Sequence, residues 1–233
     1  MKNIIIAIDG EASSGKSTLA KALARKLSYK HINTGSMYRA VTYAALRDSL
    51  LVKDKIISEN YLHVDENKII NLIDKLSFDF KLINNHSNLF LNGVNIEKEI
   101  RFTQVSDFVS QVSAIFGVRK KIVEIQRKMG LDKGVVMEGR DIGSVVFPLA
   151  ELKLFITADI FIRVGRRYNE LKINNQSVTK KSVLENLQKR DFIDKNRKHS
   201  PLIKVKDAIL IDNSELSVDD QISIINNYLK KNY

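Results

Sequence analysis

The stretch that decides the fold is IIIAIDGEASSGKST, residues 4–18. It begins with a run of β-branched residues, which is typical of a strand buried on both faces in a parallel sheet. Residues 10–17 then match the pattern G-x-x-x-x-G-K-[ST]. Leu19, Leu23 and Leu27 follow at helical spacing. A strand, a glycine-rich loop and an amphipathic helix in this order predict an anion site, because the loop amides and the helix N-terminus point at one ligand.

The loop indicates a nucleoside-triphosphate site, and the alternative is a strand–helix turn without chemical function. Lys16 is expected to reach the β- and γ-phosphates, and the Ser17 hydroxyl to ligate Mg²⁺. No N-K-x-D tetrad for guanine occurs, so ATP is the expected donor. Glu11 is an anion within the loop, and its side chain is expected to point outward. The residues assigned to ATP in the loop are Gly10, Ser13, Ser14, Gly15, Lys16, Ser17 and Thr18.

The rest of the chain predicts an α/β fold in three layers, a parallel sheet flanked by helices, because short apolar strands alternate with helical stretches. A length of 233 residues with 44% hydrophobic content is sufficient for one domain, expected to span residues 1–233. Alternating apolar residues at about 74–100, with the turn pair Asn92-Gly93, predict a small antiparallel sheet inserted into this fold.

Composition limits the classes of function. The chain has no cysteine, which excludes disulfides and thiolate chemistry and fits a cytoplasmic location. No segment approaches the ~20 apolar residues of a membrane helix, so no membrane partner is expected. The net charge of +11 is compatible with nucleic acid, phosphorylated substrates or biased composition. Since only 7% of residues are aromatic and tryptophan is absent, no nucleic-acid partner is expected. Nothing in the sequence requires more than a monomer.

Arginine is the rarer cation, with 12 Arg against 26 Lys, so its clusters call for a reason. Arg163, Arg166 and Arg167 lie on one helix face, where like charges repel unless an anion faces them. The alternative is a solvated face partly neutralised by Glu170.

Two further segments combine charge with a favourable position. Arg190, Asp194 and Arg197 share a second helix face, for which internal salt bridges are the alternative interpretation. The segment EGRDIG, residues 138–143, follows a predicted strand at 135–137. Ligands of parallel sheets bind at the carboxyl ends of the strands, although an ordinary charged turn is the alternative.

Together these segments resemble the bacterial cytidylate (CMP) kinases, from residue 4 to about 230. The resembling segments are residues 8–18, 33–39, 99–101, 110–112 with Arg119, 138–148 and 190–201. The run GRDIGSVVFP at 139–148 is the most specific of them. The resemblance implies a P-loop kinase that transfers the γ-phosphoryl group of ATP to CMP or dCMP, giving ADP and CDP or dCDP, with Mg²⁺ as cofactor.

The resemblance also implies the roles of particular residues. It implies that the cytosine edge is read by Ser110, Arg119 and Asp141, and that Asp194 holds the ribose hydroxyls. The residues that it implies around the CMP phosphate are Thr34, Tyr38, Arg39, Arg140 and Arg190, with Arg101 and Arg197 near CMP. The residues that it implies at the ATP phosphates are Arg163, Arg166 and Arg167. The residues expected to neutralise charge during transfer are Lys16, Arg140, Arg163, Arg167 and Arg190.

The family pattern further implies a CMP-binding insertion at about 62–104 and a helical lid at about 158–177. Glu11 and Asn33 depart from that pattern, which commonly has proline and aspartate there. Two alternatives stay open. One is a P-loop kinase for another small molecule, such as UMP, AMP or shikimate, and the other is a basic nucleic-acid-binding protein with a vestigial phosphate loop.

Overall fold

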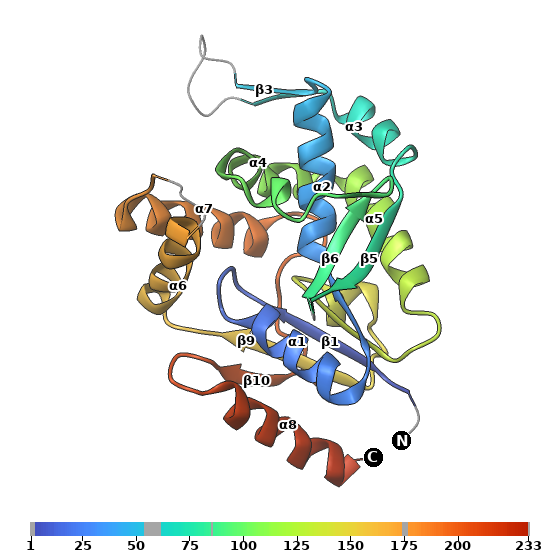
Figure 1. Ribbon diagram of the computed structural model, residues 1–233, viewed down its shortest axis with the longest axis vertical. Coiled ribbons are helices and arrows are strands. Elements are labelled where there is room, and N and C mark those ends of the chain that lie inside the picture. The colour runs from blue at the N-terminus through green and yellow to red at the C-terminus, as the bar shows by residue number, and fades with distance from the viewer. Residues whose placement is uncertain (1–2, 54–61, 85, 174–176, 233) are drawn as a thin grey trace. The chain divides into compact units, whose positions relative to one another are not determined.

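The chain forms two units, one of Met1–Asn33 with Gln126–Tyr233 and the other of Thr34–Ile125. Figure 1 shows the computed structural model, which describes residues 3–53, 62–84, 86–173 and 177–232. The first unit contains a parallel sheet, and the second contains short antiparallel strands.

A five-stranded parallel sheet in the order β10-β9-β1-β8-β2 is the centre of the first unit. Its strands are β1 (Ile5–Gly10), β2 (Lys30–Asn33), β8 (Val135–Gly139), β9 (Leu152–Thr157) and β10 (Ile209–Asp212). In β1, Ile5 lies opposite Val135 and Ile6 opposite Leu152. β1 is therefore an interior strand of the sheet, and Ile6 and Ile8 of its isoleucine run are fully buried. The parallel α/β sheet predicted from the sequence is confirmed.

Two helices pack on one face of this sheet, α1 (Lys16–Leu27) and α8 (Val218–Asn232). Leu19 and Leu23 of α1 and Ile225 of α8 share a core with Ile6 and Ile8 of β1. These isoleucines alternate along β1 with residues on the other face, as the twofold period of a strand requires. The core fixes β1 against α1 and therefore fixes the loop that joins them.

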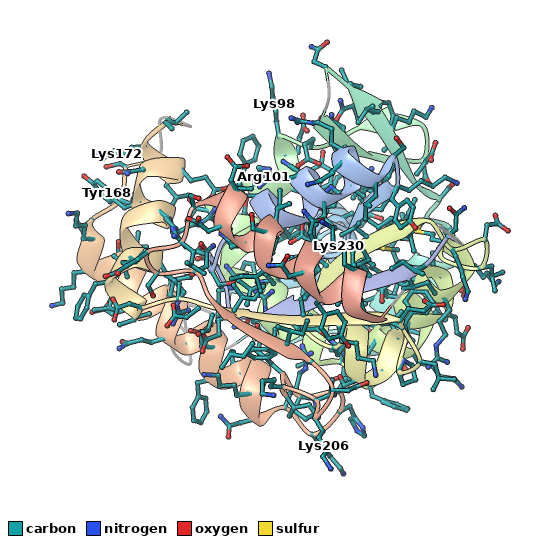
Figure 2. All side chains as sticks on the ribbon, turned by 90° about the horizontal axis from the view of Figure 1, so that it is seen from below. Lys98, Arg101, Tyr168, Lys172, Lys206 and Lys230 are labelled. Atoms are coloured by element: carbon teal, nitrogen blue, oxygen red, sulfur yellow. The ribbon has the colours of Figure 1, made fainter. Side chains whose placement is uncertain are left out.

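A second core joins α6 (Ile160–Ile173) and α7 (Lys180–Asn196). It consists of the buried residues Val164, Leu171, Val183 and Leu187, with Ala12 of the phosphate loop. Near the ends of these helices the Tyr168 ring lies 5.7 Å from Lys172 Nζ and 5.8 Å from Lys180 Nζ, and Tyr168 and Lys172 are labelled in Figure 2. Residues 174–176 of the expected lid lie outside the described residues.

The second unit combines helices with two antiparallel sheets. Its helices are α2 (Thr34–Arg47), α3 (Glu66–Ile73), α4 (Thr103–Ala114) and the first part of α5 (Phe116–Met129). Strands β3 (Leu51–Lys53) and β4 (Leu62–Val64) form one sheet, and β5 (Phe78–Ile83), β6 (His86–Leu91) and β7 (Val94–Asn95) form the other. A short 3₁₀ turn, Glu99–Arg101, precedes α4. Within this unit α2 packs against both α3 and α4.

The small antiparallel sheet predicted at about 74–100 is confirmed. Its turn between β6 and β7 is formed by Asn92 and Gly93, with φ values of 49° and 81°. Two consecutive positive φ angles match the twist of the flanking strands, which is why an Asn-Gly pair signals a hairpin. Among the described residues, no helix has the length and apolar character needed to cross a membrane.

Candidate functional site

Two glycines give the loop between β1 and α1 its path. Gly10 has φ 148°, and a Cβ there would lie 2.0 Å from the carbonyl oxygen of Ile156. Gly15 has φ 95°, and a Cβ there would lie 2.0 Å from Nδ2 of Asn213. Asn213 donates a hydrogen bond of 2.8 Å to the carbonyl of Ser14. Both glycines are therefore required by close approach as well as by backbone conformation.

Lys16 is the first residue of α1 and is buried. Its Nζ donates to the carbonyl of Glu11 and, at 3.3 Å, to the hydroxyl of Ser14. Burial and the neighbouring Arg140 hold the pKa of Lys16 well below its ordinary value. An anion beside Nζ would favour the charged form, so the loop presents a lysine suited to binding phosphate.

Ser17, the next residue, lies beside a buried carboxylate. Its Oγ donates 2.7 Å to Oε2 of Glu138, and Nδ2 of Asn33 donates 3.5 Å to the same Oγ. Burial raises the pKa of Glu138, but its hydrogen bond with His31, 2.9 Å long, together with Lys16 and Ser17, lowers it further. Glu138 is therefore ionised, and with Ser17 it presents the hard oxygen ligands that Mg²⁺ prefers.

Glu138 was included in the predicted charged segment but was given no role there. The available signal was an acidic residue at the carboxyl end of a buried strand. The pairing of this strand, β8, with β1 brings the carboxylate to the phosphate loop. That pairing could not be predicted from the sequence.

Asp9 is a second residue that the sequence reasoning missed. Its carboxylate accepts from the amides of Ile142 at 2.8 Å and Gly143 at 2.7 Å. Burial raises the pKa of Asp9 to about 6, although these two hydrogen bonds oppose the shift. Asp9 thereby fixes the start of a short π-helix, Ile142–Val146, and with it the position of Asp141, which is itself buried.

The three arginines predicted to share a helix face all lie on α6. The Arg163 guanidinium donates to the carbonyl of Ala12 at 3.3 Å and forms an ion pair of 2.6 Å with Asp191. The Arg166 guanidinium donates to the carbonyl of Ser14 at 3.4 Å. Two of the arginines thus touch the phosphate loop itself.

Arg167 pairs with Glu170 at 2.8 Å, which is the partial neutralisation that the sequence offered as the alternative. Arg167 is nevertheless buried, so its charge acts in a poorly screened environment.

A second cluster in the same unit joins the EGRDIG segment to α7. The Arg140 guanidinium donates 2.9 Å to Asp194, and Arg197 lies 3.4 Å from the other oxygen of that carboxylate. Burial raises the pKa of Asp194, but Arg140, Arg197 and Arg190 together hold it below its ordinary value. The salt-bridge interpretation of this helix face is therefore correct for the pair of Asp194 and Arg197.

The Nε of Arg190 is buried and has no hydrogen-bond partner among the described residues. Burial, then Arg140 and Arg167, lower its pKa to about 10. Arg140 also lowers the pKa of Lys16. Arg140 thus repels both Lys16 and Arg190, and Arg167 also repels Arg190. Such a cluster is suited to a multiply charged anion.

The remaining predicted residues belong to the second unit. Arg119 is buried, its guanidinium lies 5.2 Å from the Tyr38 ring centroid, and it donates 2.9 Å to the carbonyl of Ser113. Arg39 donates to the hydroxyl of Ser106 at 3.0 Å. Arg101 is partly exposed and pairs with Glu97. Thr34 and Ser110 are buried on α2 and α4, respectively.

A parallel sheet whose central strand leads into a phosphate loop, with cations gathered at that loop, defines a P-loop phosphotransferase. The likeness to a solved structure agrees with this fold: an uncharacterized protein from Eubacterium ventriosum superimposes with a TM-score of 0.53 at 15% identity, covering 99% of both chains.

Comparison with known sequences narrows the class further. The sequence profile of the cytidylate kinase family matches residues 6–231. A cytidylate kinase from Flavobacterium psychrophilum is 51% identical over 226 residues, 97% of each chain. One from Parabacteroides distasonis is 46% identical over 221 residues, covering 95% of this chain and 94% of its own. The chain belongs to the cytidylate kinase family.

Proposed function

We propose that the protein transfers the γ-phosphoryl group of ATP to the phosphate of CMP or dCMP, giving ADP and CDP or dCDP. The observation that carries this proposal is the phosphate loop itself, with Lys16 buried at the start of α1 and the Arg163 and Arg166 guanidinium groups donating to carbonyls of the loop. Family membership supports CMP as the acceptor and favours it over UMP, AMP, shikimate or nucleic acid.

The protein has to position the two substrates and neutralise negative charge, because phosphoryl transfer passes through a loose transition state. The loop amides and Lys16 would hold the β- and γ-phosphates. Arg140, Arg167 and Arg190 would stabilise the negative charge that spreads over the transferred group. The acceptor oxygen needs no strong base in this scheme, since little covalent bonding to it has formed at the transition state.

Mg²⁺ fits the residues that surround the loop. Ser17 would hold the ion directly, and Glu138, which accepts a hydrogen bond from the Ser17 hydroxyl, would hold it or one of its waters. When bound there, Mg²⁺ would neutralise part of the negative charge of the phosphates. The geometry of His31 and Asn33 around Glu138 and Ser17 keeps these two oxygen donors together.

For the acceptor, we assign recognition to residues of each unit in turn. In the first unit Asp141 would accept from the cytosine amine, Asp194 would hold the ribose, and Arg140, Arg190 and Arg197 would surround the phosphate. In the second unit Ser110 and Arg119 would read the base. The other residues assigned to CMP there are Thr34, Tyr38, Arg39 and Arg101.

The experiment is a coupled ADP-release assay with CMP, dCMP, UMP, AMP and shikimate as acceptors. Turnover with CMP and dCMP far above the rest is expected. In the same panel Asp141→Ala should erase the preference for CMP over UMP, because a carboxylate accepts from the amine of cytosine but not from the carbonyl of uracil. A preference that survives in this variant would show that Asp141 does not read the base.

The protein is further proposed to act as a cytoplasmic monomer that binds no nucleic acid. Size-exclusion chromatography with light scattering tests the oligomeric state. A filter-binding assay at several salt concentrations tests the second point, since binding through phosphate contacts would weaken steeply with salt.

A further inference from the structure

Glu11 is the residue of the phosphate loop that the proposed reaction does not use. Its Oε1 accepts a hydrogen bond of 2.7 Å from Lys195 Nζ, and its Oε2 accepts one of 3.0 Å from the hydroxyl of Thr157. The Arg163 guanidinium approaches Oε2 to 3.9 Å. The carboxylate is therefore directed at the end of β9 and at α7, and Glu11 as a whole is only 9% exposed.

The main-chain carbonyl of Glu11 faces the Lys16 side chain. It accepts from Nζ of Lys16, the lysine proposed to hold the phosphates. One residue thus contacts Lys16 through its backbone and Lys195 through its side chain. The Glu11 carboxylate is therefore only a few bonds away from the carbonyl that contacts Lys16, so a change in its charge affects the phosphate site.

A carboxylate in this position opposes ATP binding unless it is compensated, because like charges in a poorly solvated site repel strongly. Burial raises the pKa of Glu11, but Lys195, then Arg163 and Thr157, lower it further, so the side chain is ionised. Arg163 is shared with Asp191, which leaves Lys195 as the cation that, among the described residues, pairs with Glu11 alone.

Stability alone does not account for this pair. The Lys195 side chain is 49% exposed, and ion pairs of such exposed lysines contribute little to folding. Its positive charge is nevertheless held at the loop, where it would interact electrostatically with an anionic ligand.

We propose that Glu11 and Lys195 form a charge-compensated pair, in which Lys195 cancels the repulsion between Glu11 and the phosphates of ATP and so sets the affinity of the loop for triphosphate. Lys195 is then a positioning residue of the ATP site, although it lies at the far end of α7. This inference rests on the part of the proposed function that makes ATP the donor.

The test is a cycle of variants measured by calorimetric titration with ATP, at low salt and without acceptor. Lys195→Met should weaken ATP binding about five-fold, and Glu11→Gln should strengthen it by a similar factor. The double variant should bind ATP within about two-fold of the unmodified protein, because both charges are gone. Lys189→Met, at an exposed lysine of the same helix, is the matched control and should leave ATP binding unchanged.

A purely structural role predicts a different pattern. It would weaken ATP binding in all three variants, would lower their unfolding temperatures and would affect adenosine, which carries no phosphate, as much as ATP. That pattern overturns the proposal, as does normal ATP binding by Lys195→Met. If a single variant does not fold, the charge exchange Glu11→Lys with Lys195→Glu takes its place, and retained ATP affinity supports the pair while its loss contradicts it.

The cycle also separates this inference from the choice of acceptor. A protein that follows the expected pattern with ATP but phosphorylates no CMP supports the pair and contradicts the proposed acceptor. A protein that binds no ATP contradicts both.

Discussion

At the scale of single residues, the phosphate loop concentrates cations that repel one another. Lys16 is buried and its pKa is lowered by that burial and by Arg140, while Arg190 has a buried Nε without a partner among the described residues. These groups are destabilised relative to their state in water. A polyphosphate relieves both problems, because it supplies counter-charge and hydrogen-bond acceptors together.

Replacing Lys16 with methionine therefore should remove transition-state stabilisation but leave the acceptor site intact. The turnover number for CMP is expected to fall by about 10²–10³-fold, the usual cost of losing one charged donor at the reacting group. Steady-state kinetics measure turnover, and calorimetric titration with CMP serves as the control for binding. Turnover near that of the unmodified protein would contradict the role of Lys16.

Asp194 links the site to stability at low pH. Its pKa is lower in the folded protein than in the unfolded chain, so the ionised carboxylate contributes stability above pH ~3.8, and this contribution is lost as pH falls through the folded pKa. Asp194→Asn should lower the free energy of unfolding at pH 7 by about 3 kcal/mol, because it leaves Arg140 and Arg197 without their buried partner. Urea denaturation at a series of pH values should show the difference shrinking below pH 4.

A difference that stayed constant from pH 7 down to pH 3 would mean that Asp194 contributes through packing and not through its charge. Asp207→Asn is a useful comparison, because that carboxylate is exposed and its ion pair with Lys153 lies away from the phosphate loop.

At the scale of elements, α6 and α7 depend on their own small core. Leu187 is fully buried there, against residues of both helices and Ala12 of the phosphate loop. Damage to this core should therefore reach the loop, because the same packing that holds the two helices together also supports one of its residues.

Leu187→Ala is expected to lower the free energy of unfolding by about 3 kcal/mol through the cavity that it leaves. The KM for ATP should rise, since Ala12 loses a packing partner. Leu149→Ala, at a side chain 92% exposed, should change both quantities little. Denaturant unfolding and steady-state kinetics on the two variants would distinguish a core that supports the loop from one that does not.

Local patterns were sufficient to predict most elements. The isoleucine run before the loop predicted a central strand, and Asn92-Gly93 predicted a hairpin, because each signal depends on nearest neighbours along the chain. The contacts of Glu11, Glu138 and Asp9 were not predictable in the same way. Each joins residues more than a hundred positions apart, which only the strand order of the sheet and the packing of its helices bring together.

The assignments of an insertion at 62–104, a lid at 158–177 and one domain over the whole chain stay predictions. The lid and the bounds of the insertion came from a family pattern, and a measurement of how segments respond to ligands tests them. The single domain came from chain length and composition.

At the scale of the whole molecule, ATP alone is expected to affect the first unit, whereas CMP is expected to affect both units, because Asp141, Asp194 and Arg190 of the first unit are also assigned to it. ATP alone should slow hydrogen exchange of amides in the phosphate loop and in α6 and α7 of the first unit. CMP alone should slow exchange in α2 and α4 of the second unit, which carry Thr34, Tyr38 and Ser110. Exchange mass spectrometry with each nucleotide measures both effects, and no response of residues 34–125 to CMP would contradict their assignment to the acceptor.

The register of β1 has a consequence for how the chain is made. Ile5 pairs with Val135, and Ile6 pairs with Leu152, so both neighbours of this strand leave the ribosome long after it does. At about 5–20 residues per second, synthesis of the intervening chain takes roughly ten seconds. During that time an apolar strand has no partner, and such a strand is prone to pair with another chain. The nascent protein is therefore expected to depend on chaperones for its first strand more than for any later one.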